Sequence, residues 1–293
     1  MIDLSTPIRR IPYLVGLAAA FCALGLAPAP ADAQIKHEST LGIRATPVGL
    51  NVISDTGYRI GLFDSENPLL KNTYIDSGLT TGISPAYLWA GPYLEILPAA
   101  VLKLRVSAQY VNYFGILGYL YKPEADQDWG LDKLAEGATN NSGVSGTGWM
   151  FEGRVTPQIK IGNVVALAET RFTKLTMDID ANYYEPYFDL LFAPDEFFWI
   201  TRPTVGYVLG SNPSNSYLLL ALRWERAVAT TTEVVRDTAG LVYVWKIPSD
   251  WISWGEPVLS GFGGVFIGHP NRNPDGVSPY FGTQITVKFA GGQ

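Results

Sequence analysis

The sequence contains almost no cysteine and very little histidine. Cys22 is the only cysteine, and His37 and His269 are the only histidines. One cysteine forms no disulfide within the chain and no multi-cysteine metal site. Cys22 also lies in a segment that we expect to be removed. The sequence therefore excludes a disulfide scaffold and a thiol enzyme, and we expect neither a metal nor a cofactor.

Runs of like charge are also missing. The chain has 21 basic and 27 acidic residues, which give a net charge of −6, and its basic residues do not cluster. Proteins that bind nucleic acids carry basic patches, so we expect no nucleic-acid partner. Beyond residue 33 no apolar run is long enough for a membrane-spanning helix, which excludes a helical membrane protein once the N-terminus is cleaved.

The first 33 residues have the pattern of a cleaved secretory signal peptide. Arg9 and Arg10 precede a short apolar stretch at 14–26, and residues 31–33 have the small-x-small form of a cleavage site. The apolar stretch is shorter than the roughly 20 residues that a spanning helix needs. We predict cleavage after Ala33. Residues 1–33 are then a signal peptide, and residues 34–293 form one exported domain.

Apolar and polar residues alternate strictly along much of this domain. Between residues 149 and 161 the odd positions are mostly apolar, while the even ones include Glu152, Arg154 and Lys160. Successive side chains of a β-strand point to opposite faces, so this period of two predicts a strand. The same alternation is strong at 102–110, 217–225, 241–247 and 280–289, and weaker at 41–52, 58–63, 84–97, 164–172, 199–209 and 259–267.

Such strands fit either a secreted soluble β-sandwich that binds carbohydrate or a transmembrane β-barrel. The polar faces carry charges of both signs, as a barrel lumen does, and the segments have the length of about ten residues that crosses a bilayer. Short and long connections also alternate. Long ones are expected at 122–148, 177–197, 231–236 and 269–278, and short ones at 162–163, 210–215 and 248–256. The predicted fold class is therefore all-β, a closed antiparallel transmembrane β-barrel.

The number of predicted strands is eleven, whereas single-chain bacterial barrels have an even number. We expect twelve strands, with ten as the alternative. The missing strand would come from a break near residues 112–115 within the segment 101–121, or from a short strand hidden within 63–81.

The end of the chain resembles the C-terminal insertion signal of the bacterial outer-membrane β-barrel superfamily. The resemblance spans about ten residues and is carried by Tyr280, Gly282, Ile285, Val287 and Phe289. Phe289 is followed by a short tail instead of ending the chain, which departs from the usual pattern. The resemblance implies the outer membrane of a Gram-negative-type cell, with outer-membrane lipid and the barrel-assembly machinery as partners.

The polar face of the alternation predicts which charges point into the lumen. Nine of them are basic and three are acidic, so an open, porin-like barrel would favour small anionic solutes. The leading hypothesis for the function is a narrow passive channel, or a structural or surface-interaction protein, with a mainly basic lumen. The lumen-facing candidates are Lys103, Arg105, Glu152, Arg154, Lys160, Glu169, Arg171, Arg202, Arg223, Glu225, Lys246 and Lys288.

An outer-leaflet lipid or peptide hydrolase is the alternative. Outer-membrane phospholipases, lipid A deacylases and omptin-like proteases use barrels of roughly this size and need a base, usually histidine. His269 is the candidate, with Asp275 and Ser278 nearby in the sequence. Nothing in this spacing brings a nucleophile within hydrogen-bond reach of the base. We therefore expect no catalytic residue.

The connection at 177–197 is both acidic and aromatic. Carboxylates can bind Ca²⁺, and aromatic rings can stack on sugars. However, residues 178–180 lack the glycine and the later glutamate of an EF-hand loop. We expect a solvated extracellular loop, in which the candidates for binding a partner are Asp178, Asp180, Tyr184, Glu185 and Tyr187.

Overall fold

The computed structural model describes residues 34–45, 48–116, 120–123, 129–140, 143–210, 216–248, 255–272 and 278–290. The predicted signal peptide at 1–33, with Cys22, lies outside the described residues, and so does Asp275. Among the residues that are described, no helix has the length and apolar character needed to cross a membrane.

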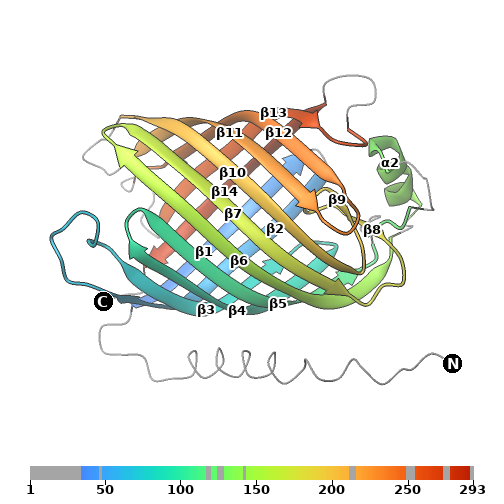
Figure 1. The fold of residues 1–293 in the computed structure, drawn as a ribbon, viewed down its shortest axis with the longest axis horizontal. Coiled ribbons are helices and arrows are strands. Elements are labelled where there is room, and N and C mark those ends of the chain that lie inside the picture. Colours follow the sequence, from blue (N-terminus) through green and yellow to red (C-terminus); the bar gives the residue numbers. More distant parts are fainter. Residues whose placement is uncertain are drawn as a thin grey trace.

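Twelve antiparallel strands form one closed barrel (Figure 1). Each strand pairs with the next barrel strand of the chain, and the first strand closes the barrel on the last, from Lys36 opposite Ala290 to Arg44 opposite Gly282. The expected number of strands is thus confirmed. The strands are β1 (Gln34–Ala45), β2 (Val48–Gly61), β3 (Tyr74–Ile83), β4 (Tyr87–Ala99), β5 (Leu102–Phe114), β6 (Ser145–Ile161), β7 (Val164–Met177), β10 (Asp195–Leu209), β11 (Tyr217–Ala229), β12 (Val235–Lys246), β13 (Glu256–Gly268) and β14 (Pro279–Ala290).

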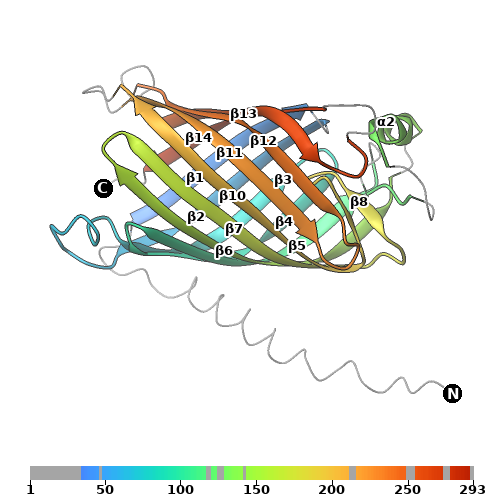
Figure 2. The ribbon, with the colours of Figure 1, turned by 45° about the horizontal axis from the view of Figure 1, so that its top comes forward.

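The strands run obliquely to the barrel axis (Figure 2). Their two faces differ as predicted. On β11, Leu222 points outward and is 68% exposed, whereas the adjacent Ala221 points inward and is 4% exposed. Val205 on β10 and Leu241 on β12 are outward and exposed in the same way. A barrel with an apolar outer face and polar inner positions has the surface that lipid hydrocarbon requires.

The structure corrects the predicted boundaries in the first third of the chain. The predicted strands 41–52 and 58–63 belong to β1 and β2, which are separated by residues 46–47. The missing strand is β3, which overlaps the region 63–81, and the segment 101–121 contributes one barrel strand, β5, so the break near 112–115 was wrong. The alternation is weak here because outward positions of β1 such as His37 and Ser39 are polar.

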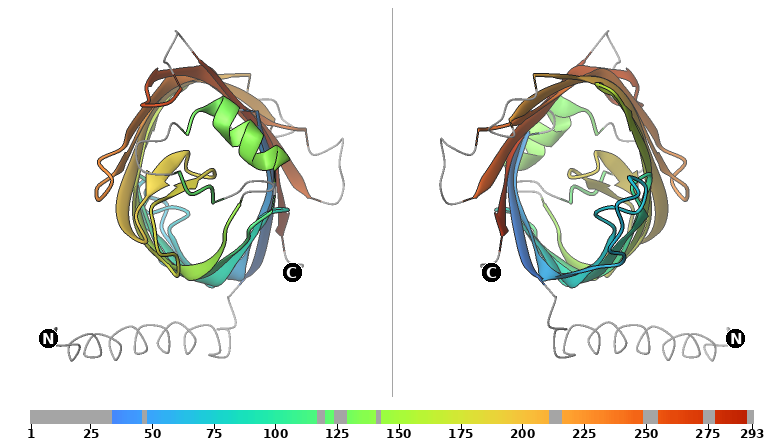
Figure 3. Two further views of the ribbon diagram at one scale, coloured as in Figure 1. Left: turned by 90° about the vertical axis from the view of Figure 1, so that its right-hand side faces the viewer. Right: turned by 90° about the vertical axis from the view of Figure 1, so that its left-hand side faces the viewer.

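The remaining elements lie in the connections. The helix α2 (Leu131–Thr139) follows β5, and a hairpin of β8 (Tyr183–Glu185) and β9 (Leu190–Phe192) follows β7. Both lie at the same end of the barrel, which we call the long-loop end, and the hairpin lies inside the barrel outline (Figure 3). The opposite, short-turn end holds the tight turn at Gly162 and Asn163. The predicted asymmetry holds only in part: the connections 115–144 and 178–194 at the long-loop end are long, but 46–47 and 84–86 at that end are short, and 62–73 at the short-turn end is long.

Leu241→Arg should destabilise the barrel because it places a charge on the lipid-facing surface. We expect a loss of about 2–4 kcal/mol in the free energy of unfolding, the cost of an arginine near the bilayer midplane. The matched control is Val242→Arg, because Val242 faces a cavity in the lumen and should tolerate the charge better. Denaturant unfolding in lipid vesicles measures both variants, and equal losses would contradict the assignment of the two faces.

Candidate functional site

Charged side chains from neighbouring strands meet on the lumen wall. Glu152 on β6 pairs with Arg154 at 2.7 Å and with Arg171 on β7 at 3.1 Å. Arg154 and Arg171 lie directly opposite each other in the register of the two strands. Two like charges at such a position would destabilise the sheet, and Glu152 offsets their repulsion by contacting both.

The ion pairs continue across β7, β10, β11 and β12. Glu169 pairs with Arg154 at 3.5 Å and with Arg202 at 3.0 Å. Glu225 contacts both Arg202 and Arg236. Opposite charges thus alternate from strand to strand, and each carboxylate lies between two guanidinium groups. We call this set the arginine–glutamate belt; it consists of Glu152, Arg154, Glu169, Arg171, Arg202, Glu225 and Arg236.

A second charged cluster lies on the strands before β6. Arg105 on β5 pairs with Asp55 on β2 at 2.7 Å and approaches Glu95 on β4 at 3.7 Å. Asp76 on β3 pairs with Arg59 at 2.8 Å and is completely buried. Sequence reasoning missed Asp55, Asp76 and Glu95, because the first four strands alternate weakly. These carboxylates reduce the excess of basic residues that was expected in the lumen.

The structure brings seven of the twelve lumen-facing candidates into these two clusters. Lys246 and Lys288 pair with Glu256 and Glu38 instead, at 3.3 Å and 3.7 Å. Lys103 and Lys160 form no ion pair with a described residue. Arg223 is the twelfth candidate, and it belongs to neither cluster.

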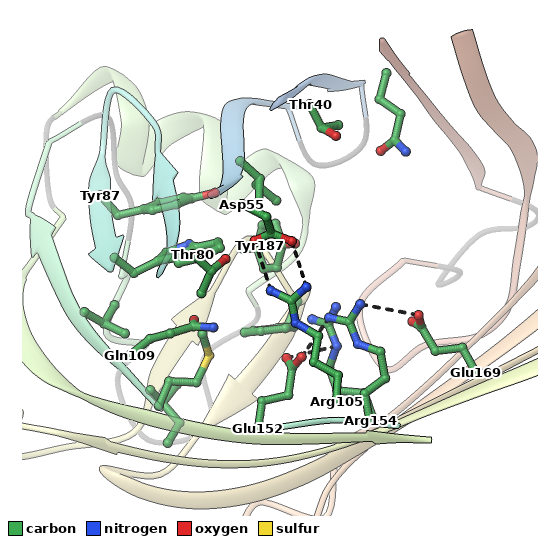
Figure 4. Close-up of a pocket in the computed structure, with 18 of the residues that line it drawn as sticks. Thr40, Asp55, Thr80, Tyr87, Arg105, Gln109, Glu152, Arg154, Glu169 and Tyr187 are labelled. Carbon is green, nitrogen blue, oxygen red and sulfur yellow. Dashed lines mark hydrogen bonds and ion pairs between the residues drawn. The ribbon is translucent and has the colours of Figure 1, made fainter. Parts of the chain in front are cut away.

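Two cavities adjoin within the lumen. The first, of about 310 Å³, is lined by Arg105, Glu152 and Arg154, and Figure 4 shows how their side chains converge on it. The second, of about 460 Å³, is lined by Arg223 among other residues. Arg202, Glu169 and Tyr187 line both cavities. The belt therefore forms part of the wall of a divided, polar interior space.

The β8–β9 hairpin packs into the lumen at the long-loop end. Phe188 and Phe192 lie with their ring centroids 4.5 Å and 4.7 Å from that of Phe198, which points inward from β10. These rings and Leu190 belong to one buried apolar cluster with inward-facing residues of β4 to β11. The expectation of a solvated loop at 177–197 was therefore wrong for the hairpin. A twelve-stranded barrel leaves space inside that its wall does not fill, and these side chains occupy it.

Buried polar contacts anchor the hairpin to the wall. The Glu185 carboxylate accepts hydrogen bonds from the Tyr113 hydroxyl at 2.5 Å and from the backbone N–H of Phe188 at 2.6 Å. Burial raises the pKa of Glu185 above its ordinary value. Arg44 on β1 donates to the backbone carbonyls of Pro186 and Tyr187. Both sides of the barrel therefore hold the hairpin in place.

A third anchor links the hairpin to the β13–β14 connection, and we call it the Asp189 latch. Asp189 accepts hydrogen bonds from Arg272 at 2.6 Å and from the Tyr184 hydroxyl at 2.7 Å, and His269 Nε2 lies 3.6 Å from its carboxylate. The side chains of Asp189, His269 and Arg272 are 0% exposed. Burial by itself would raise the pKa of Asp189, but the neighbouring basic groups, led by the Arg272 guanidinium, together outweigh it and hold this pKa at about 2.

His269 is placed as a structural residue of this latch. Its Nδ1 accepts the backbone N–H of Asn271 at 3.0 Å, and its ring packs against Trp129 and Phe266. Burial lowers the pKa of His269 to about 4, so the ring is neutral at pH 7. Ser278 donates to the carbonyl of Arg272. A base with no solvent exposure does not reach a lipid or peptide substrate, so the geometry gives the hydrolase hypothesis no support.

The loop candidates for binding a partner have separate surroundings. Tyr184 and Glu185 are buried anchors, and Tyr187 faces the cavities. Asp180 is exposed and pairs with Lys122, and Asp178 is exposed as well. Among the described residues, no three His, Cys, Asp or Glu side chains are grouped so that they could hold a metal ion.

The proposed insertion signal and the second histidine lie on β14 and β1. Ile285, Val287 and Phe289 occupy outward positions of β14, while Tyr280 and Gly282 line the second cavity. His37 also faces outward, with its ring 5.5 Å from that of Phe289. It accordingly belongs to the outer surface near the short-turn end and not to the lumen.

Comparison with known proteins gives similarity of fold only. No protein-family model and no curated protein matches the sequence. The β domain of the Bordetella autotransporter BrkA is 10% identical, with a TM-score of 0.48 over 88% of this chain and 98% of that one. The NalP translocator domain of Neisseria meningitidis is 10% identical (TM-score 0.40, 95% of each chain), and OmpT of Vibrio cholerae is also 10% identical (TM-score 0.36, 90% and 99%).

All three neighbours are outer-membrane proteins or translocator barrels by description. Their similarity is too low to carry an argument about activity. The closed twelve-stranded barrel is shown by this chain's own strand pairing.

Glu225→Gln should strongly destabilise the barrel, because it leaves Arg202 and Arg236 without their shared carboxylate. We expect the free energy of unfolding to fall by about 3 kcal/mol. This value is at the lower end of the cost of breaking a buried ion pair, because the cavity lets water reach Arg202. Glu256→Gln is the control, since the Glu256 side chain is 55% exposed and its ion pair with Lys246 should contribute under about 1 kcal/mol. Denaturant unfolding measures both, and similar small losses would contradict a structural role of the belt.

Acid should loosen the hairpin through His269. Because the pKa of His269 is about 4 when folded and about 6.5 when unfolded, its contribution to stability is complete above pH 6.5 and is lost as the pH falls to 4. The contribution of His269 to the free energy of unfolding falls by about 3 kcal/mol over this pH range. Amide hydrogen exchange of residues 183–192 between pH 7 and pH 4, corrected for intrinsic rates, measures it. His269→Gln should remove this acid-induced loss of protection, and His37→Gln should retain it; the reverse pattern would refute the assignment.

Proposed function

We propose that the protein is a non-enzymatic outer-membrane β-barrel that forms a narrow channel for small anionic solutes. The observation that carries the proposal is the pair of adjoining cavities within the lumen, whose shared wall includes Arg202. The apolar outer face supports insertion among outer-membrane lipids by the barrel-assembly machinery. The sequence pattern of a signal peptide supports export to that membrane.

The charge balance of the lumen wall supports a preference for anions. The arginine–glutamate belt contains four arginines and three glutamates, and Arg44 and Arg223 add two further guanidinium groups to the wall of the second cavity. Fixed positive charges in a confined pore raise the local concentration of anions. Pairing within the belt keeps this preference moderate, because most guanidinium groups are partly neutralised.

The β8–β9 hairpin supports a gated channel. Its apolar side chains fill the lumen at the long-loop end, and three sets of polar contacts hold it there through Arg44, Glu185 and Asp189. In this proposal the conformation with the hairpin packed inside the barrel is the closed one. Conduction then requires the hairpin to shift, and the Asp189 latch is the contact whose loss should favour that shift.

Planar-bilayer recordings test the proposal. In a KCl gradient the wild-type barrel should open rarely and its reversal potential should indicate chloride preference. Asp189→Asn should raise the open probability by about tenfold or more, because it leaves Arg272 buried without its partner. Asp180→Asn is the control, since Asp180 is an exposed residue of the same connection. Silence of both wild type and Asp189→Asn in correctly inserted barrels, or a cation preference, would overturn the channel.

A further inference from the structure

Arg223 differs from the arginines of the belt. It points inward from β11, two residues before Glu225, yet no described carboxylate lies within 4 Å of it. Its Nε is buried without a hydrogen-bond partner, as are those of Arg154, Arg171 and Arg236, but each of these three has a carboxylate partner. Burying a guanidinium without an anion is costly, and folded proteins usually compensate such a charge. The uncompensated charge of Arg223, which lines the second cavity, therefore indicates a place for an anion.

The position of the Arg223 guanidinium leaves its terminal Nη donors available to the cavity. Its central carbon lies 4.2 Å from the ring centroid of Phe262 on β13, which indicates a cation–π contact. The N–H donors of a guanidinium lie in its own plane, so contact with a ring on one face leaves them free to bind a planar, two-oxygen acceptor. Carboxylates present that geometry.

The cavity beside Arg223 has a cationic side and an apolar side. Its volume of about 460 Å³ lies in the range of small-molecule sites. Arg44 and Arg236 contribute further positive charge to its wall, while Leu167, Val242 and Val244 contribute apolar surface. An inorganic anion would leave the apolar side without a contact, whereas an organic anion would use both.

We propose that this cavity binds an organic monocarboxylate, with the carboxylate on Arg223 and an apolar body against Leu167, Val242 and Val244. The inference rests on the proposed channel function and names its substrate class. A single negative charge fits because Arg223 is one uncompensated cation. Glu225 on the same strand and Glu169 across the cavity would repel an anion of higher charge.

Calorimetric titration of the detergent-solubilised barrel with sodium benzoate tests the site. Arg223→Gln should weaken benzoate binding by at least tenfold. The matched control is Arg226→Gln, since Arg226 lies on the same strand but pairs with Asp237 on the outer face, and it should bind as the wild type does. Benzamide, which has the same shape and no charge, should bind at least tenfold more weakly than benzoate.

A second variant keeps the test decisive if Arg223→Gln fails to fold. Val244→Phe leaves every charge in place and fills the apolar side of the cavity, so it should weaken benzoate binding about fivefold or more. Equal benzoate affinity in wild type, Arg223→Gln and Val244→Phe, or equal affinity of the wild type for benzoate and benzamide, would overturn the site.

Bilayer recordings separate this inference from the channel proposal. Block of the chloride current by benzoate in the wild type, relieved in Arg223→Gln, supports the site. Chloride current that benzoate does not affect, together with no calorimetric binding, overturns the site and leaves the channel standing. Arg223-dependent binding without any current supports the site and overturns the channel.

Discussion

The hydrogen-bonded closure of β1 on β14 is the constraint on which the rest of the structure depends. A strand with an unpaired edge would expose backbone N–H and C=O groups to lipid hydrocarbon, where each costs several kcal/mol. The ladder between Lys36 and Arg44 on β1 and their partners on β14 removes both edges at once. Once the sheet is closed, every side chain must face either lipid or lumen, and the alternating sequence assigns each residue to one of them.

The width of a twelve-stranded barrel creates the second requirement, because its wall cannot fill the interior alone. Two solutions coexist in this lumen. At the long-loop end the chain folds back, and Phe188, Leu190 and Phe192 provide an apolar filling. In the rest of the lumen, charged side chains extend from the wall and pair across neighbouring strands, while the remaining volume stays open as two cavities. An apolar, packed region and a charged, unfilled region thus lie next to each other in one lumen.

The alternation of apolar and polar residues at odd and even positions made the facing of many side chains predictable. Wherever a strand alternates clearly, as β6, β11 and β14 do, a single residue assigned to the lumen fixes the facing of all the others, and Glu152, Arg154 and Glu225 followed from that rule. The first four strands were predicted less well, in part because polar side chains such as His37 lie on the outer face. Consequently their inward carboxylates, Asp55 and Asp76, were missed.

The alternation of residues did not predict that the β8–β9 hairpin packs inside the barrel. An acidic, aromatic segment has the same composition whether it is solvated outside a barrel or packed within one, and only the width of the closed lumen decides between the two. The Asp189 latch joins residues 83 positions apart, and no local pattern relates Asp189 to Arg272. His269 stood out in the sequence because histidine is rare in this chain. Its burial beside Asp189, however, depends on how the loops pack together and could not be predicted.

Labelling of single cysteines along β11 tests the central claim most directly. With Cys22 replaced, cysteine is introduced in turn at Leu219, Leu220, Leu222 and Arg223, and the membrane-inserted protein is treated with a charged, water-soluble thiol reagent. We expect labelling at the inward positions 219 and 223, where water enters the lumen, and protection at the lipid-facing positions 220 and 222. Labelling at 220 and 222 as fast as at 219 and 223 would contradict it, because the apolar face would then contact water and not lipid.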